Sequence, residues 1–137
     1  MDNITKTIIV QGKLNEAKIS YKFLPNELSQ GKWRIRLQSL SYSLNGQQTM
    51  KDICVISSNL VTALRYSETN IVSNYEQPFG MIIFDPKIKR KTINFDINWL
   101  TINVYSNELI LTIASLESKQ TLNVDCDVYI LIQLMKI

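Results

Sequence analysis

The closing segment of this chain is apolar at both sets of alternating positions. Residues 127–137 read Asp-Val-Tyr-Ile-Leu-Ile-Gln-Leu-Met-Lys-Ile, which is rich in the β-branched and aromatic side chains that favour strands. Successive side chains of a strand point to opposite faces, and a small sandwich buries only one face against its own core. One face would carry Val128, Ile130, Ile132 and Leu134, and the other would carry Tyr129, Leu131, Gln133, Met135 and Ile137. We expect another copy of the chain to cover the second set, which makes it the predicted oligomer interface.

The chain has the length and composition of one globular domain. It contains 137 residues, of which 45% are hydrophobic and 20% are charged, with four glycines and three prolines. A chain of this length buries roughly two thirds of its unfolded surface, which is enough for a core without disulfides or metals. We therefore expect one domain, residues 1–137, and the composition excludes a disordered or low-complexity class.

No residue pattern indicates a catalytic reaction. Histidine is absent, which removes the commonest general base and the commonest metal ligand. The two cysteines, Cys54 and Cys126, have no CxxC spacing, so buried free thiols are favoured over a zinc site, a redox motif or a disulfide. An enzyme that uses carboxylates alone would need two acidic side chains converging in a pocket, and no spacing predicts such a pair. We expect no enzymatic activity, no cofactor and no metal.

Short runs rich in Ile, Val, Thr, Tyr and Phe recur along the whole chain, separated by Asn, Gly, Ser or Pro. Runs of this kind are typical of strands between turns. They predict about eight to nine strands, at residues 6–11, 17–24, 33–44, 52–57, 60–66, 79–84, 93–104, 109–115 and 127–137. No alternation of helical and strand patterns appears, and residues 67–78 read as a polar loop. We therefore expect an all-β fold, a single jelly-roll-like antiparallel β-sandwich.

Two of these strands change the phase of their apolar positions part of the way along. Trp33, Ile35 and Leu37 occupy odd positions, but Leu40, Tyr42 and Leu44 occupy even ones, so the phase changes near residues 38–39. A second change falls at residues 99–100, after Ile93, Phe95, Ile97 and Trp99. A β-bulge at each point would bend the strand and let it pass from one sheet to the other. We also expect Trp33 and Trp99 to be buried and residues 57–59 to form a corner.

The chain has one dense basic cluster, Lys87, Lys89, Arg90 and Lys91, which follows Asp85-Pro86. We interpret it as a solvated hairpin loop between residues 84 and 92; nucleic-acid contact and a nuclear-import signal are the alternatives. The formal charge of +3 is small and no aromatic residues interleave with the cluster, so a nucleic-acid partner is not expected. Asp125 and Asp127 begin the closing strand and are interpreted as solvated carboxylates.

The first residues lack the pattern of a secretory signal, and no segment has the run of about 18 apolar residues that a membrane span needs. We therefore expect synthesis in a reducing cytosol, no secretion by a signal peptide and no membrane span.

The order of motifs resembles a known family. The motifs are Phe23-Leu24 with Leu28, then Gly-Lys-Trp-Arg-Ile-Arg-Leu-Gln-Ser-Leu at 31–40, then Ile-Cys-Val-Ile-Ser-Ser-Asn-Leu-Val at 53–61, and finally the hydrophobic closing strand. Together they resemble small jelly-roll structural proteins of Maverick/Polinton elements and related double-stranded DNA viruses. The resemblance implies a virion component of penton, minor-capsid or fibre-head type, assembled in the host cytoplasm or nucleus. It also implies a homo-oligomer around a symmetry axis, with a trimer favoured and a pentamer possible, and other capsid proteins or a host surface molecule as partners.

A second function is compatible with the same sequence. A trimeric, lectin-like module that binds a ligand or receptor would have the same sandwich and the same oligomeric state. In that case residues 67–78 and 85–91, which include Lys87, Lys89, Arg90 and Lys91, would contact the ligand.

Overall fold

The computed structural model describes residues 5–16, 18–23, 31–45, 51–67, 70–76, 78–85, 87–95, 99–104 and 107–137, with the backbone alone for residues 62–67 and 70–76 and for Asn103. Within these ranges every regular element is a strand, and all the strand pairs are antiparallel. The all-β prediction is therefore confirmed for the described part of the chain. No helix in these ranges is long and apolar enough to cross a membrane.

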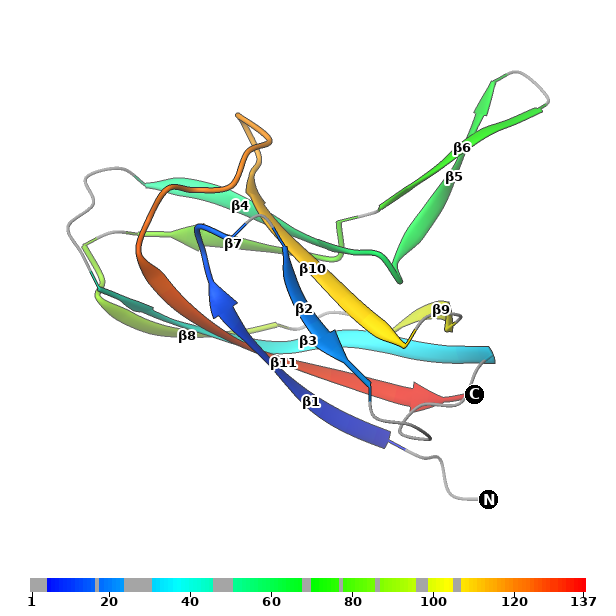
Figure 1. Cartoon of the computed structure of the whole chain (residues 1–137), viewed down its shortest axis with the longest axis horizontal. Coiled ribbons are helices and arrows are strands. Elements are labelled where there is room, and N and C mark those ends of the chain that lie inside the picture. Colours follow the sequence, from blue (N-terminus) through cyan, green and yellow to red (C-terminus); the bar gives the residue numbers. More distant parts are fainter. Residues whose placement is uncertain are drawn as a thin grey trace.

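The strands form two sheets and a separate hairpin (Figure 1). The five-stranded sheet contains β1 (Thr5–Lys13), β11 (Cys126–Lys136), β3 (Gly31–Leu44), β8 (Arg90–Asn94) and β9 (Leu100–Val104). The four-stranded sheet contains β2 (Ile19–Lys22), β10 (Glu108–Ser115), β4 (Asp52–Ser58) and β7 (Gly80–Phe84). The hairpin consists of β5 (Thr62–Ser67) and β6 (Asn70–Glu76).

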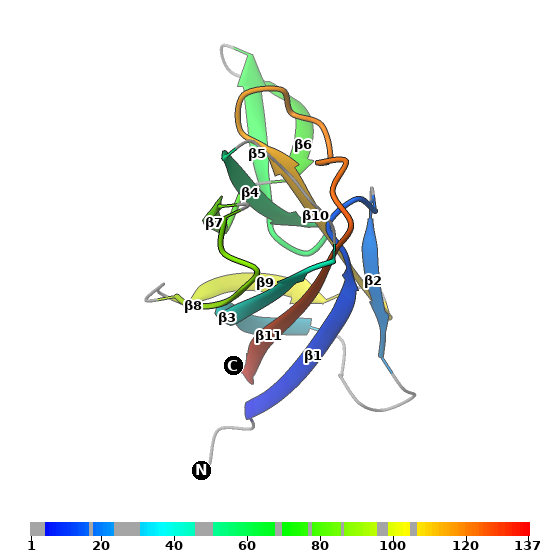
Figure 2. The same ribbon diagram turned by 90° about the vertical axis from the view of Figure 1, so that its left-hand side faces the viewer.

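The strands pair in a nested order. β1 pairs with β11, β2 with β10, β3 with both β8 and β9, and β4 with β7. A long antiparallel ribbon that is rolled up around a core has this order, and the additional pairs β3–β11 and β4–β10 join neighbouring turns of the roll. The result is a jelly-roll sandwich. Figure 2 shows the two sheets as separate layers.

The core lies between the sheets because each strand places alternate side chains inward. The inward residues of β11 are Val128, Ile130, Ile132 and Leu134, all 0% exposed. They belong to one cluster with the inward residues of the four-stranded sheet, which include Ile19, Cys54, Ile56, Ile82, Phe84, Leu109, Leu111 and Ile113. One face of the closing strand is therefore core, as the alternation predicts.

The predicted phase change in the long early strand is a β-bulge. Along β3, Ser39 lies opposite Leu131 and Leu37 lies opposite Ile132, so Gln38 has no partner on β11. The carbonyl of Gln38 instead accepts a hydrogen bond of 3.0 Å from the N–H of Phe95. The extra residue keeps apolar side chains on the inner face both before and after the bulge. The bulge is confirmed at the predicted position.

The predicted consequence of the bulge was wrong. β3 does not change sheets, since it pairs with β11 from Trp33 to Leu44. What changes is the neighbour on its other side, which is β9 before the bulge and β8 after it. The predicted strand 93–104 is accordingly two strands, and β9 begins at Leu100, where the second phase change was expected.

Several connections differ from the sequence-based expectation. The loop predicted at residues 67–78 is largely the hairpin β5–β6. The segment between β7 and β8 does not close a hairpin, because the two strands belong to different sheets. A local pattern identifies a turn, but it does not show which strand the chain pairs with after the turn.

The two tryptophans are buried to different extents. Trp33 is 2% exposed, as expected for a core residue. Trp99 is only half-buried, and the guanidinium of Arg36 lies 4.4 Å from its ring centre. Trp99 therefore packs at the edge of the five-stranded sheet, where the guanidinium and the aromatic ring stabilise each other. The prediction that Trp99 is substantially buried holds only in part.

The corner expected at residues 57–59 is confirmed. β4 ends at Ser58, and the side chain of Asn59 accepts a 2.8 Å hydrogen bond from the N–H of Ile110 and donates a 3.0 Å bond to the carbonyl of Glu108. The hydroxyl of Ser58 accepts from the N–H of Leu60 at 3.2 Å. These amide and hydroxyl groups satisfy backbone groups where the ladder stops, which is a structural role for the corner.

Two neighbouring isoleucines on β1 test the assignment of inner and outer faces. Ile8 is 4% exposed and Ile9 is 58% exposed. Ile8→Ala should lower the free energy of unfolding by about 2–5 kcal/mol because it leaves a cavity in the core. Ile9→Ala should change it by less than about 1 kcal/mol. Urea unfolding of the two variants at low protein concentration measures both values, and equal losses would contradict the register of β1 on β11.

Candidate assembly surfaces

The residues predicted as an oligomer interface lie on the outer face of the five-stranded sheet. β11 runs in the middle of this sheet, between β1 and β3, so its outward side chains form the centre of that face. Tyr129 is 44% exposed and Ile137 is 57% exposed, whereas Leu131, Gln133 and Met135 are half-buried. We call these five residues the β11 face. The structure brings them together on one side of the sandwich, and their contact with a second copy stays a prediction.

Neighbouring strands extend the β11 face and give it a mixed character. Ile9 lies opposite Leu131 and adds an exposed aliphatic side chain. Arg34 lies opposite Met135, and Arg36 lies opposite Gln133, to which its Nε donates a hydrogen bond of 2.8 Å. The surface is therefore an apolar centre with arginines along its β3 side.

The structure shows a second apolar surface, on the outer face of the four-stranded sheet. Four large side chains there are Ile53, Met81, Ile83 and Leu116, with exposed fractions of 42%, 59%, 59% and 49%. Ile53 lies opposite Ile83, and its carbonyl accepts a 2.7 Å hydrogen bond from the N–H of Leu116, so these residues are neighbours. We call the four residues the β4–β7 patch. Contiguous exposed apolar residues on a soluble protein mark an interaction surface.

Sequence reasoning missed the β4–β7 patch although the same signal was present. Residues 53–56 read Ile-Cys-Val-Ile and residues 81–84 read Met-Ile-Ile-Phe, so both runs are apolar at odd and at even positions. As in the closing strand, apolar residues at both sets of alternating positions place some of them on the outer face of the sheet.

The patch continues into an open groove of about 650 Å³. Ile53, Ile83 and Leu116 contribute its apolar wall, and Lys51, Asp52 and Glu117 contribute charged groups. The carboxylate of Asp52 accepts a 3.0 Å hydrogen bond from the hydroxyl of Ser115, and the ammonium of Lys51 lies 3.5 Å from the carboxylate of Asp85.

Among the described strands, β7 has the features of an unprotected edge. It ends the path of the four-stranded sheet, and Gly80–Phe84 contains no charged residue. Soluble proteins usually protect such an edge with charges, prolines or a covering element. The edge therefore adds to the surface that a partner could bury.

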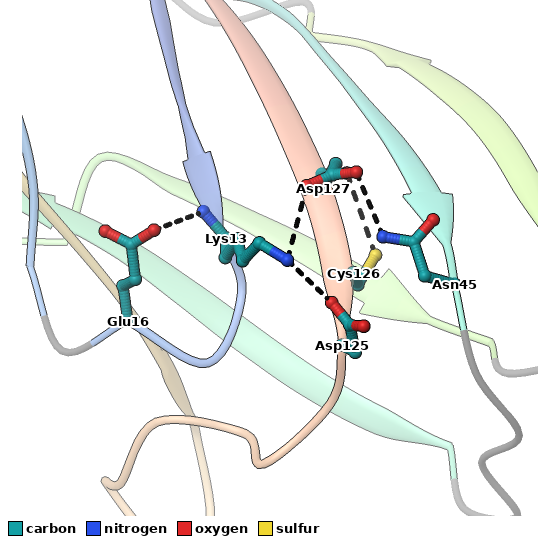
Figure 3. Close-up of polar contacts among 6 residues, drawn as sticks. All are labelled: Lys13, Glu16, Asn45, Asp125, Cys126 and Asp127. Carbon is teal, nitrogen blue, oxygen red and sulfur yellow. Dashed lines mark hydrogen bonds and ion pairs between the residues drawn. The ribbon is translucent and has the colours of Figure 1, made fainter.

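The acidic pair beside the closing strand belongs to a surface network (Figure 3). The Nζ atom of Lys13 lies 2.9 Å from Oδ1 of Asp125 and 4.0 Å from Oδ1 of Asp127, and Asn45 donates a 3.0 Å hydrogen bond to Oδ2 of Asp127. The hydrogen bond with Asp125 raises the pKa of Lys13 and lowers the pKa of Asp125. The ammonium of Lys13 therefore lies near both carboxylates. The network connects the end of β1 to the start of β11.

The basic cluster spans a loop and the start of a strand. Lys87 and Lys89 follow β7, whereas Arg90 and Lys91 are the first residues of β8, opposite Ser43 and Tyr42. All four side chains are exposed. The prediction of a solvated cluster is confirmed, but the prediction that it forms a hairpin loop was wrong, because the segment connects the two sheets. Asp85 anchors this connection: its Oδ1 accepts a 3.0 Å bond from the N–H of Lys87, which lowers the pKa of Asp85.

Both cysteines are buried free thiols, as expected. Cys54 and Cys126 are each 0% exposed. Burial raises the pKa of the Cys54 thiol to about 12 and that of Cys126 to about 11. A thiol reacts as its thiolate, so neither group is activated as a nucleophile.

Comparison with protein-family models and with curated protein sequences finds no match for this chain.

The thiols provide a test of the packed core. Neither thiol should react with Ellman's reagent at pH 8 in the folded protein, because both are inaccessible and uncharged at that pH. Both should react within minutes in 6 M guanidinium chloride, where burial is lost. Rapid reaction of either thiol in the folded protein would show that the sheets are not closed around it.

The basic cluster should be dispensable for folding. Replacing Lys87, Lys89, Arg90 and Lys91 with Ser should change the melting temperature by no more than about 2 °C, since exposed surface charges contribute little. Scanning calorimetry of the variant gives this shift. A large loss would show that these side chains are packed, and salt-sensitive DNA binding that disappears in the variant would indicate a nucleic-acid surface.

Proposed function

We propose that this protein is a non-enzymatic structural protein that assembles with copies of itself into a cyclic homo-oligomer. The observation that supports the proposal is that apolar side chains are exposed on the outer faces of both sheets. Ile9 and Tyr129 are 58% and 44% exposed on one side, and Met81 and Ile83 are each 59% exposed on the other. Burial of this area against another copy would stabilise an assembly by about 25 cal/mol for each Å² of apolar surface removed from water.

The fold and the motif order support a virion component. Jelly rolls occur in capsid proteins, and they also occur in lectins and in other proteins, so this step rests on analogy of fold. The resemblance to structural proteins of Maverick/Polinton elements and double-stranded DNA viruses favours a penton, minor-capsid or fibre-head component over the other functions of the fold. We propose a trimer, with a pentamer as the alternative symmetry, and other capsid proteins as further partners.

The hairpin β5–β6 supports the alternative of a ligand-binding or receptor-binding head. It extends away from the sandwich in both views (Figure 1, Figure 2). Elements that project from a rigid scaffold commonly carry recognition. This function would require the same oligomer. The structural component and the binding head therefore differ only in what the projecting hairpin contacts, which is a neighbouring subunit in the first case and a ligand or receptor in the second.

A pair of charge substitutions on the β11 face tests the assembly. Leu131→Glu combined with Met135→Glu should give a monomer or an insoluble protein, because a carboxylate buried in an apolar contact without a partner is strongly destabilising. The matched control is Ile88→Glu with Lys89→Glu, at two exposed positions of the connection between β7 and β8, outside both apolar surfaces. Size-exclusion chromatography with light scattering gives the mass of each. A wild-type oligomer that tolerates the β11 substitutions would exclude the β11 face as the interface.

A further inference from the structure

We infer that the β11 face of one copy packs against the β4–β7 patch of the next copy, so that subunits associate front to back. This inference rests on the proposed self-assembly and names the two surfaces that meet. The two surfaces lie on the outer faces of different sheets, and therefore on opposite sides of the sandwich. A contact between unlike surfaces buries both of them with a single type of interface. Repeated from subunit to subunit, it forms a closed ring when the rotation between neighbours brings the last subunit back to the first.

The apolar side chains of the two surfaces suit this contact. Two sheets pack face to face at about 10 Å when apolar side chains interdigitate between them. Tyr129, Leu131 and Ile9 supply such side chains on one face, and Ile53, Met81 and Ile83 supply them on the other. The contact would repeat between subunits the packing that already holds the two sheets together within one subunit.

The charges around the two surfaces favour unlike over like pairing. Arg34 and Arg36 border the β11 face. The five strands of that sheet contain a single acidic residue, Asp127. Asp127 lies at the start of β11, far from the two arginines, and Lys13 and Asn45 contact its carboxylate. Two β11 faces placed against each other would bring together two surfaces whose bordering charges are basic. The groove beside the β4–β7 patch offers the carboxylates of Asp52 and Glu117, and its Lys51 ammonium lies near Asp85. Opposite charges at the border of an apolar contact select the partner and the orientation.

The hairpin β5–β6 provides an independent reason to place a partner on the patch. Its two strands pack against each other but make no substantial contact with any other strand of the described chain. An isolated two-stranded hairpin is marginally stable in water. Both views show that it extends past the four-stranded sheet on the side away from the five-stranded sheet, which is the side that the patch faces (Figure 1, Figure 2). A copy docked on the patch would therefore lie beside the hairpin and cover it.

The hairpin would enlarge the contact. A sheet face four strands wide and about six residues long has a footprint of roughly 20 Å by 20 Å. A stable protein interface buries about 800 Å² of accessible surface on each partner. A sheet face of this size makes a small interface, and contact with the neighbouring hairpin would add to it, so deletion of the hairpin should weaken assembly.

Complementation between two variants tests the inference. Leu131→Glu with Met135→Glu keeps the patch intact, and Met81→Glu with Ile83→Glu keeps the β11 face intact. Each variant alone should run near the chain mass of 15.8 kDa, with assembly weakened at least about 100-fold. Co-expressed, they should form a dimer containing one copy of each, which cannot grow further because its remaining surfaces are blocked. Ile88→Glu, at an isoleucine that is 37% exposed outside both surfaces, is the control and should keep the wild-type mass.

The outcomes separate this inference from the proposed function. If wild type is oligomeric but the two variants fail to complement each other, or if either variant keeps the wild-type mass, the front-to-back contact is wrong and self-assembly stands. A monomeric wild type would overturn both.

Cysteine cross-linking gives a second measurement that does not depend on disruptive substitutions. Tyr129→Cys and Met81→Cys replace exposed residues, and the two native thiols are buried. A short bismaleimide should link the two variants to each other when they are co-expressed, and should link neither to itself. Linkage of Tyr129→Cys to itself would show that like faces meet.

Replacement of residues 63–75 by a short Gly-Ser turn tests the role of the hairpin. Thr62 and Glu76 are paired, so their Cα atoms are about 5 Å apart and a short turn can join them without strain on β4 or β7. The melting temperature at low concentration should stay near that of wild type, while the assembly dissociates at least 10-fold more readily on dilution. Unchanged dissociation would remove the hairpin from the interface.

Discussion

The antiparallel pairing of β11 with β1 on one side and with β3 on the other is the contact on which the sandwich depends. It joins the last strand of the chain to the first, residue by residue from Lys13–Asp127 to Thr5–Met135, and it closes the five-stranded sheet. The inner side chains of β11 are completely buried, so the same strand also supplies the centre of the core. Because a strand presents alternate residues to opposite faces, this placement exposes the other set of apolar residues on the surface. The closure of the fold and the exposure of a second apolar face follow from one geometric constraint.

Local features of the fold could be predicted from the sequence, and long-range features could not. The bulge near Gln38 and the corner at Ser58 were predictable because each leaves a signature within a few residues, a change of apolar phase or a group of small polar side chains. The partners of the strands were not, because alternation shows which side chains share a face but not which strand lies beside them. For this reason β3 was expected to change sheets, and the hairpin β5–β6 was expected to be a loop.

The candidate surfaces show the same limit. The β11 face was predictable because its strand is long and apolar on both faces. The β4–β7 patch carries the same pattern in two shorter strands. Its accessibility to a partner depends on β7 lying at the edge of its sheet, and only the strand pairing shows this position. Trp99 is in phase with core residues in the sequence, yet it lies at the side of the sheet against Arg36, because the chain leaves the strand before it. Burial depends on neighbours that no local pattern identifies.

The central claim is that the exposed faces of this sandwich are buried in an assembly of identical subunits. Native mass spectrometry of the unmodified protein at micromolar concentration tests it most directly. The account predicts one closed species whose mass is a whole multiple of the 15.8 kDa chain, with three copies favoured and no continuous ladder of larger forms. A single stable species at 15.8 kDa under these conditions would contradict the account, because the apolar outer faces of both sheets would then be stable in water without a partner.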